Sequence, residues 1–291
     1  MRHDLKQFLR WVGGALAIAG IVFVILRLQG YGSEIDFTSF NKVKWMAVGI
    51  FILVYGFSNV ILSFAWWNLL LKFGARTTRC WAIRTYGISQ LAKYVPGNIF
   101  HLAGRQALGM AAGVLGWPLA KSTIWELGLV TLAGAVLGMF ALPLVVPDIT
   151  VLNVCGIIII AFLVVVILLG HYATPKAAKA FAWYVLFLCI SSALFVGLIQ
   201  LVSPLSITNT ASCFMVGGAY LLAWLAGFLT PGAPAGLGVR EFVLIFLLQD
   251  HVVGAYLLLA ILLGRAVSVC GDLLFFVSVS LVGSRRDDVI V

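Results

Sequence analysis

Eight ionisable side chains stand in or beside long apolar runs of this sequence, where a charge is costly. They are Lys93, His101, Arg105, Glu126, Arg240, Glu241, Arg265 and Asp272. An unpaired Asp, Lys or Arg at the centre of a membrane helix costs roughly 2.5–3.5 kcal/mol. We therefore expect these groups to pair with one another, to reach water or to lie near an interface. Groups held in this way are candidate binding or transport residues.

The spacing of these residues favours partners from different segments. Arg265 and Asp272 are seven residues apart, so they share a helix face but are too distant for a tight pair. We expect each of them to find another partner. Glu126 is the most isolated acid, and Arg105 or Arg240 is its expected partner. The simpler interpretation of these charges, as structural ion pairs, stays open.

Three further residues have simple alternatives of their own. The Lys93 ammonium could reach the membrane interface along its aliphatic chain. His101 stands in a glycine-containing stretch, where a histidine is more often a hydrogen-bonded spacer than a proton carrier. Glu241 follows Arg240 directly, so the two point about 100° apart on a helix and should serve different partners.

Two apolar stretches are interrupted by Gly and Pro. The first spans 87–116 with the core KYVPGNIFHLAGRQ, and the second spans 229–249 with the core TPGAPAGLGVRE. Such breaks free backbone N–H and C=O groups, which at membrane depth must lie inside the protein or along a wet cavity. We therefore predict re-entrant hairpins or broken helices. The candidate backbone positions are Pro96, Gly97, Asn98, Pro231, Gly232, Gly236 and Gly238.

The two stretches share one spacing. Arg105 follows Pro96 by nine residues, and Arg240 follows Pro231 by nine. Corresponding interrupted segments in two parts of a chain are typical of transporters built from repeats, with the binding site at the repeat interface. Whether the repeats would be parallel or inverted stays open.

The composition places the chain in a membrane. Of 291 residues, 63% are hydrophobic and 10% charged, and the mean hydropathy is +1.11. Soluble domains carry about 25% charged residues, so a cytosolic enzyme is excluded. Apolar runs long enough to span a bilayer occur near 9–28, 45–71, 122–146, 149–170, 181–202, 211–230 and 252–282. We predict an all-α bundle of about 7–8 spans, forming a single domain over 1–291.

The loop charges predict the orientation. The 72–84 loop carries four bases and no acid, whereas 29–40 carries two acids and no base. By the positive-inside rule the first is cytoplasmic and the second outside, which also places the basic N-terminus in the cytoplasm. The net charge of +9 then reflects orientation in an inner membrane, with anionic headgroups as a second role and no nucleic acid as a partner.

The motifs of soluble catalysis are missing from the sequence. It contains no P-loop, no G-x-S-x-G, no H-E-x-x-H and no dinucleotide fingerprint. The five cysteines form no C-x-x-C pair and have no histidine at a zinc spacing. We expect no catalytic residue, no metal and no cofactor.

The two interrupted cores resemble the membrane region of lysylphosphatidylglycerol synthase/flippase proteins and their stand-alone relatives. The likeness runs from about 10 to 282. Its first motif is matched by Lys93, Tyr94, Val95, Pro96, Gly97, Ile99 and Arg105, and its second by Gly232, Pro234, Gly236, Gly238, Arg240 and Glu241; Glu126 and Arg265 match single helix positions. The resemblance implies movement of lipids between leaflets, aminoacylated phosphatidylglycerol among them. The 291 residues contain no soluble aminoacyl-transferase domain, so we expect no synthase activity.

These observations lead to one expected function and two alternatives. We expect a flippase that moves a polar or charged phospholipid between leaflets, with membrane lipids and possible further copies of the chain or cell-envelope enzymes as partners. A transporter of a soluble solute or ion is one alternative. A non-transporting partner of a cell-envelope glycosyltransferase is the other. The candidate transport residues are Lys93, Pro96, Gly97, Asn98, His101, Arg105, Glu126, Pro231, Gly232, Gly236, Gly238, Arg240, Glu241, Arg265 and Asp272.

Overall fold

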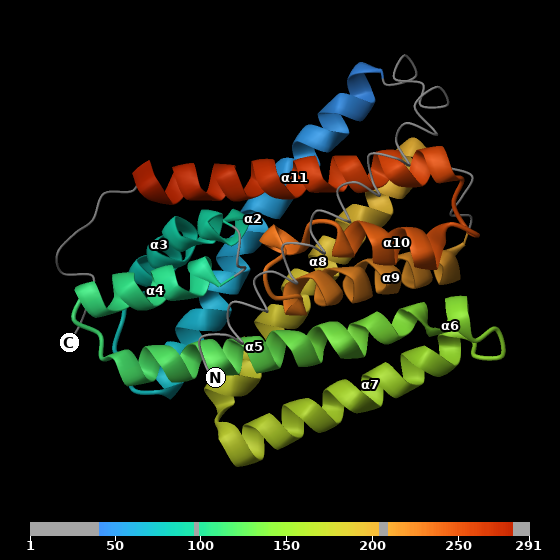
Figure 1. The fold of residues 1–291 in the computed structure, drawn as a ribbon. Helices are drawn as coiled ribbons and strands as arrows, with labels where there is room; N and C mark the ends of the chain where they lie inside the picture. Colours follow the sequence, from blue (N-terminus) through green and yellow to red (C-terminus); the bar gives the residue numbers. More distant parts are fainter. Residues whose placement is uncertain (1–40, 96–98, 204–208, 282–291) are drawn as a thin grey trace, which may run out of the picture.

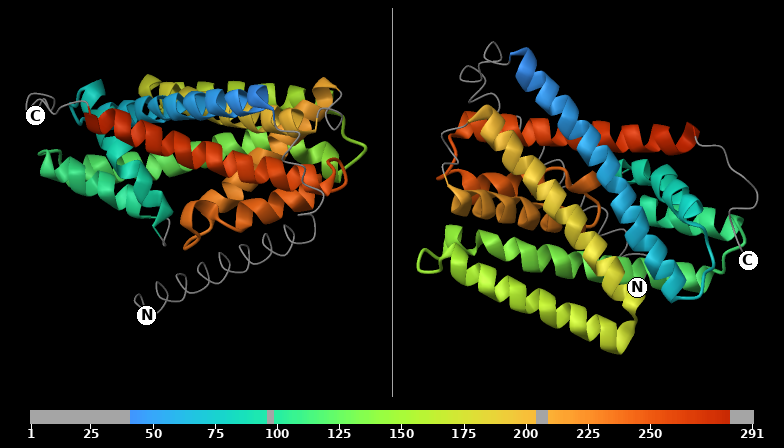
Figure 2. Two further views of the ribbon diagram at one scale, coloured as in Figure 1. Left: turned by 90° about the horizontal axis from the view of Figure 1, so that it is seen from above. Right: turned by 180° about the vertical axis from the view of Figure 1, so that it is seen from behind.

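The computed structural model describes residues 41–95, 99–203 and 209–281, and in these ranges the chain is helical and contains no strand. The elements in chain order are α2 (Lys42–Lys72), α3 (Arg79–Gln90), η2 (Leu91–Tyr94), α4 (Phe100–Ala111), α5 (Gly116–Gly138), η3 (Met139–Ala141), α6 (Leu142–Val145), α7 (Val151–Leu168), η4 (Leu169–Ala173), α8 (Pro175–Val202), α9 (Thr210–Leu229), η6 (Pro234–Gly236), α10 (Val239–Leu248) and α11 (Gly254–Leu281). Figures 1 and 2 show α5, α7 and α11 running in roughly similar directions, with α2 and α8 crossing them obliquely.

Six of the described helical segments are long and apolar enough to cross a membrane. They are Lys42–Lys72, Gly116–Val145, Val151–His171, Pro175–Val202, Thr210–Leu229 and Gly254–Leu281. Each coincides with one of the runs expected from hydropathy, so the prediction of an all-α multi-pass membrane protein is confirmed. The expected span near 9–28 lies outside the described residues.

Short polar side chains start most of the long helices. The Asn41 Oδ1 atom accepts the Lys44 amide at 3.0 Å, and Thr150 and Thr174 cap α7 and α8 in the same way. The Asn209 Oδ1 atom accepts the Ser212 amide at 2.8 Å at the start of α9. Each cap satisfies an amide that has no intrahelical partner, so the spans begin where the apolar runs begin.

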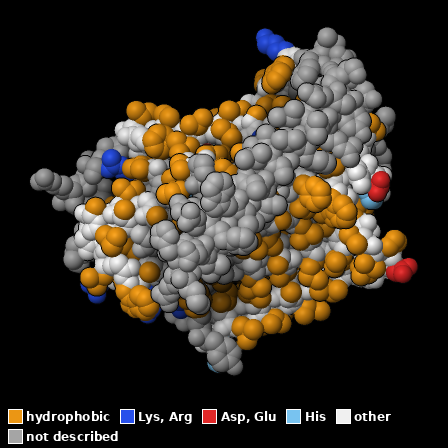
Figure 3. Space-filling view, in the orientation of Figure 1, with side chains coloured by type: hydrophobic (Ala, Val, Ile, Leu, Met, Phe, Trp, Pro, Cys, Tyr) orange, Lys and Arg blue, Asp and Glu red, His pale blue; other side chains and the backbone are white. Residues whose placement is uncertain are grey.

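The core lies where α2, α8 and α11 cross, with α5 and α9 packed against them (Figures 1 and 2). Its largest fully buried side chains include Trp66 of α2 and Phe181, Tyr184 and Phe187 of α8. By contrast, α7 lies at the edge of the bundle, and only 11% of its most apolar window is buried. Apolar side chains cover much of the visible described surface, as a lipid-facing exterior requires (Figure 3).

In both Gly/Pro-interrupted stretches one helix ends and the next folds back against it. Helices α3 and α4 pack on each other, as do α9 and α10. With 12, 12 and 10 residues, α3, α4 and α10 are about 15–18 Å long, well short of a bilayer core of about 30 Å. The two pairs open toward opposite ends of the bundle, and their tips, η2 and η6, are in contact (Figures 1 and 2). Helices therefore end and restart within both stretches, and residues 96–98 lie outside the described part.

The charges at the two ends of the bundle differ. The links α2–α3 and η4–α8 lie at one end. Arg76 lies in the first link, and Lys72, Arg79 and Lys176 lie at the adjoining helix ends. The links α6–α7 and α10–α11 lie at the other end and carry Asp148 and Asp250. Lys42 and Lys44 begin α2 at the opposite end of that helix from Lys72, so bases occur at both ends of the bundle and these two acids at the second.

The contact between α9 and η3 yields a packing test. A Cβ atom added to Gly218 would meet the backbone of Phe140 and Ala141 at distances that real side chains do not show. Because backbone cannot move aside cheaply, Gly218→Ala should destabilise the protein by about 3 kcal/mol and lower its Tm in detergent. Gly128→Ala is the matched control, since nothing lies within 4 Å of its Cβ position. Equal Tm values for the two variants would contradict this packing.

Candidate functional site

A polar cavity lies inside the apolar bundle, where the two interrupted segments meet. Its volume is about 80 Å³, room for several water molecules. Its wall combines residues of both interrupted segments with residues of α2, α5, α8, α9 and α11. The polar and charged lining residues are Tyr55, Tyr86, Gln90, Lys93, Tyr94, His101, Glu126, Tyr184, Arg240, Arg265 and Ser268.

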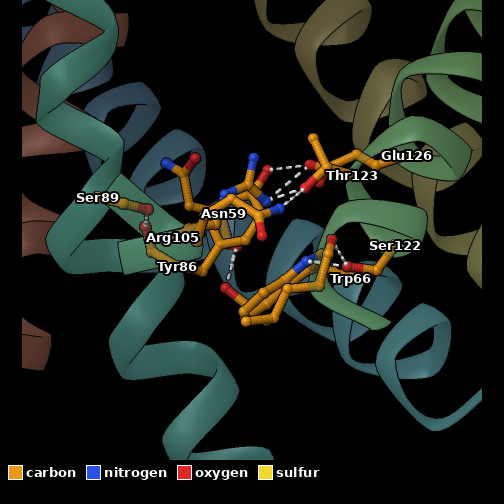
Figure 4. Close-up of polar contacts among 11 residues, drawn as sticks. Asn59, Trp66, Tyr86, Ser89, Arg105, Ser122, Thr123 and Glu126 are labelled. Carbon is orange, nitrogen blue, oxygen red and sulfur yellow. Dashed lines mark hydrogen bonds and ion pairs between the residues drawn. The ribbon is translucent and has the colours of Figure 1, made fainter. Parts of the chain in front are cut away.

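One buried ion pair joins α4 to α5. The Arg105 Nη1 atom donates to both carboxylate oxygens of Glu126, at 2.7 and 3.0 Å (Figure 4). The Tyr86 hydroxyl donates to Oε1 of the same carboxylate at 3.1 Å. This is one of the two partners expected for Glu126, and it fastens the second half of the first hairpin to a spanning helix.

Aromatic rings hold the Arg105 guanidinium in place. It lies 4.3 Å from the centre of the Tyr86 ring and 5.4 Å from that of Trp66, within cation–π range of both. The Trp66 indole N–H donates in turn to the Ser122 hydroxyl at 3.1 Å, on the same helix as Glu126 (Figure 4). With its charge compensated and its rings packed, Arg105 is 2% exposed and does not line the cavity.

A second ion pair joins η2 to α11. The Lys93 ammonium lies 2.7 Å from Oδ2 of Asp272, which also accepts the Tyr94 hydroxyl. The Asn59 amide of α2 donates to Oδ1 at 3.3 Å, so both oxygens of this fully buried carboxylate have donors. The alternative that Lys93 merely extends to the membrane interface is therefore wrong, because Asp272 holds it inside the bundle.

A third ion pair joins α10 to α11. The Arg265 Nε atom donates to Oε1 of Glu241, and its Nη1 atom donates to the Ala235 carbonyl of η6 at 3.0 Å. Oε2 of Glu241 accepts the amide of Gly238 at 2.7 Å, as a first-turn acid does at a helix start. Arg265 and Asp272 thus each have a partner from a different interrupted segment, as their spacing indicates.

Arg240 differs from these residues. It takes part in none of the ion pairs found among the described residues, and its Nε atom is buried without a hydrogen-bond partner. Its guanidinium lies 5.5 Å from the centre of the Trp224 ring and faces the cavity. Arg105 and Arg240 share a spacing from a proline but not a role: Arg105 is the sixth residue of α4, whereas Arg240 is the second of α10.

Glycines shape the break between α9 and α10. Gly232, Gly236 and Gly238 all have positive φ, at 92°, 71° and 84°, a conformation that glycine adopts readily. A Cβ on Gly236 would lie 2.6 Å from the Gly227 Cα atom, so the tip packs directly on α9. Pro231 is exposed, and Pro96, Gly97 and Asn98 lie outside the described residues.

The structure brings most of the expected site residues together and separates a few. Lys93, His101, Glu126, Arg240 and Arg265 line the cavity. Arg105, Glu241 and Asp272 lie behind the wall as partners of those residues, so Arg105, although a candidate transport residue, does not line the cavity. The physical reason is the Glu126 carboxylate, which draws Arg105 away from the cavity into an aromatic pocket.

Several polar residues of the site escaped the sequence analysis. Tyr184 of α8, Tyr86 of α3 and Asn59 of α2 are buried and face the ionised groups or the cavity. Their signal was a polar group within an otherwise apolar run. Asn59 and Ser63 are one such pair, four residues apart on one helix face.

The described residues contain no group of three or more His, Cys, Asp or Glu that could hold a metal ion. Compared with known proteins, the sequence matches no protein-family model and no curated protein. The site therefore has to be interpreted from its own geometry.

The Arg105–Glu126 pair gives a stability prediction. Glu126→Ala should lower the free energy of unfolding by about 3–5 kcal/mol, because it leaves a buried guanidinium without a counter-charge. The double variant Arg105→Met with Glu126→Leu should recover most of that loss, since two apolar side chains need no partner. Unfolding followed in detergent measures both.

Asp250→Ala is the control for this comparison. Asp250 is exposed and lies in the α10–α11 link, so its loss should leave the free energy of unfolding within about 0.5 kcal/mol of the wild type. A Glu126→Ala midpoint as high as that of Asp250→Ala would show that the buried pair contributes little.

Proposed function

We propose that the protein moves a polar or charged lipid between the two leaflets of the membrane. One observation supports this proposal above all: a polar cavity, with the positive charge of Arg240, unpaired among the described residues, in its wall, lies within an apolar bundle. The cavity lies where the two interrupted segments are in contact, and these segments open toward opposite ends of the bundle. A cavity of this kind offers a headgroup polar contacts at a depth where lipid tails offer none. The resemblance to the membrane region of lysylphosphatidylglycerol synthase/flippase proteins supports the same proposal.

The finer topology belongs to this proposal. The pairs α3/α4 and α9/α10 act as re-entrant segments entering from the two membrane faces. The end bearing Lys72, Arg76, Arg79 and Lys176 is cytoplasmic, since positive loops stay inside. The chain resides in the inner membrane with its N-terminus in the cytoplasm. Because α9 belongs to a re-entrant pair in this arrangement, the other five of the six described candidates cross the membrane, and the expected first span adds one more.

The ion pairs hold the walls of the cavity in position. The Glu126–Arg105 pair fixes one wall, and the pairs of Lys93 and Arg265 fix the two hairpin tips to α11. A headgroup entering between the tips would meet Arg240, whose charge no carboxylate of the described residues neutralises. The acyl chains would stay in the surrounding lipid, so that only the polar part crosses through the protein.

Lipid exchange in reconstituted vesicles tests the proposal. Wild-type protein should move fluorescently labelled phosphatidylglycerol between leaflets faster than protein-free vesicles do. Arg240→Gln should slow that exchange at least tenfold, because a charge-assisted hydrogen bond contributes about 1.5–3 kcal/mol. The exchange rate is measured by quenching the label in the outer leaflet.

Arg76→Gln is the matched control, because Arg76 is an exposed arginine in the α2–α3 link and does not line the cavity. It should exchange lipid at the wild-type rate. A wild type no faster than empty vesicles would refute lipid movement and favour transport of a soluble solute or a role as a partner of another enzyme. Full activity of Arg240→Gln would refute the part assigned to the cavity.

A further inference from the structure

The donors and acceptors of the central cavity are unequally satisfied. All six oxygens of Glu126, Glu241 and Asp272 accept at least one hydrogen bond. The buried side-chain atoms without a partner include Nε of Arg240 and Nη2 of Arg265, both obligate donors, and both residues line the cavity. The unused capacity at the cavity therefore belongs mainly to donors.

Two more groups reinforce this pattern. The Tyr184 hydroxyl is buried without a partner on a fully buried side chain, and it lines the same cavity from α8. The His101 Nδ1 atom is also unpartnered and lines the cavity from α4. Four of the seven such atoms in the described structure thus surround one cavity, from four helices. An occupant rich in acceptor oxygens would satisfy the two arginine donors and the tyrosine hydroxyl, because unpaired buried polar groups are costly. The His101 Nδ1 atom can either donate or accept.

The charge balance points the same way. Lys93, Arg105 and Arg265 are each neutralised by one carboxylate at no more than 2.7 Å. Arg240 remains as one surplus positive charge at the cavity wall. An occupant with one negative charge would therefore neutralise the site. An added ammonium group would find its carboxylate partners already bound, and Asp272 and Glu241 do not line the cavity.

We propose that the cavity binds the phosphodiester of a lipid whose headgroup carries one net negative charge and no ammonium group, at Arg240, Arg265 and Tyr184. Planar arginine donors suit phosphate oxygens, and the Tyr184 hydroxyl adds a third donor from α8. This rests on the proposed function for the identity of the ligand as a lipid. Such a site would not favour an aminoacylated, positively charged lipid, which is among the cargoes that the family resemblance implies.

Competition for the purified protein tests the headgroup charge. Native mass spectrometry of the full chain, mixed with equal amounts of phosphatidylglycerol, phosphatidylethanolamine and lysylphosphatidylglycerol, should show phosphatidylglycerol bound at least fivefold over either other lipid. Arg240→Gln should bring the bound ratio close to that of the mixture. Arg76→Gln, outside the cavity, should keep the wild-type ratio. Equal or preferred binding of lysylphosphatidylglycerol by the wild type would overturn the proposal.

Two conservative variants keep the test informative if Arg240→Gln folds poorly. Arg240→Lys retains the charge and should retain the preference for phosphatidylglycerol. Tyr184→Phe removes one donor without changing charge, so it should weaken phosphatidylglycerol binding several-fold and leave the order of the three lipids unchanged. An order that inverts in Tyr184→Phe, or a preference lost in Arg240→Lys, would contradict a site based on net charge.

A soluble competitor separates the two sources of a phosphate group. Glycerol phosphate at millimolar concentration should displace little bound phosphatidylglycerol, since a lipid also gains from its acyl chains. Complete displacement would identify a soluble phosphate compound as the ligand, which overturns the lipid assignment and the proposed function together. Selective lipid binding without leaflet exchange would refute the proposed function alone. Exchange without selectivity would refute only the headgroup charge.

Discussion

The high cost of an unpaired charge in an apolar interior governs this structure. In the described part of the chain, the candidate site contains four cationic side chains and three carboxylates, and six of these seven groups are joined in ion pairs. Each pair links a residue of an interrupted segment to α5 or α11. The same interactions that remove the electrostatic cost therefore fix the two short hairpins to the long helices. Removing one partner would leave a buried charge unpaired and would also remove an attachment between a hairpin and a long helix.

The broken backbone and the cavity depend on each other. A chain that stops being helical at η2 and η6 leaves peptide groups that need partners away from lipid. At the tip of the second hairpin, Arg265 of α11 donates to the Ala235 carbonyl, and Glu241 of α10 accepts the Gly238 amide. Glycines at positive φ allow the turn, and their lack of side chains lets the tip press on α9. The polar interior is thus partly a consequence of how the breaks are satisfied.

The hydropathy and charge patterns predicted much of this arrangement, but they did not predict which residues form the ion pairs. Long apolar runs located the six described spans, and the Gly/Pro cores located both breaks. The spacing of Arg265 and Asp272 correctly indicated partners outside their own helix. It could not say which, because Lys93 and Glu241 reach them only after the hairpins fold back. The equal spacing of Arg105 and Arg240 was misleading, since register within α4 and α10, rather than distance from a proline, decides which guanidinium faces the cavity. Tyr184 escaped notice because a lone hydroxyl in an apolar run has no pattern.

One consequence concerns α11, which carries both Arg265 and Asp272. These residues are two helical turns, or about 10 Å, apart along a single rigid rod. One holds the tip of the hairpin that opens at the acidic end, and the other holds the tip of the hairpin that opens at the basic end. A rotation or a slide of this rod would strain both attachments at the same moment. Helix α11 therefore couples the two hairpins mechanically, because a displacement of either hairpin that moves α11 also acts on the ion pair of the other.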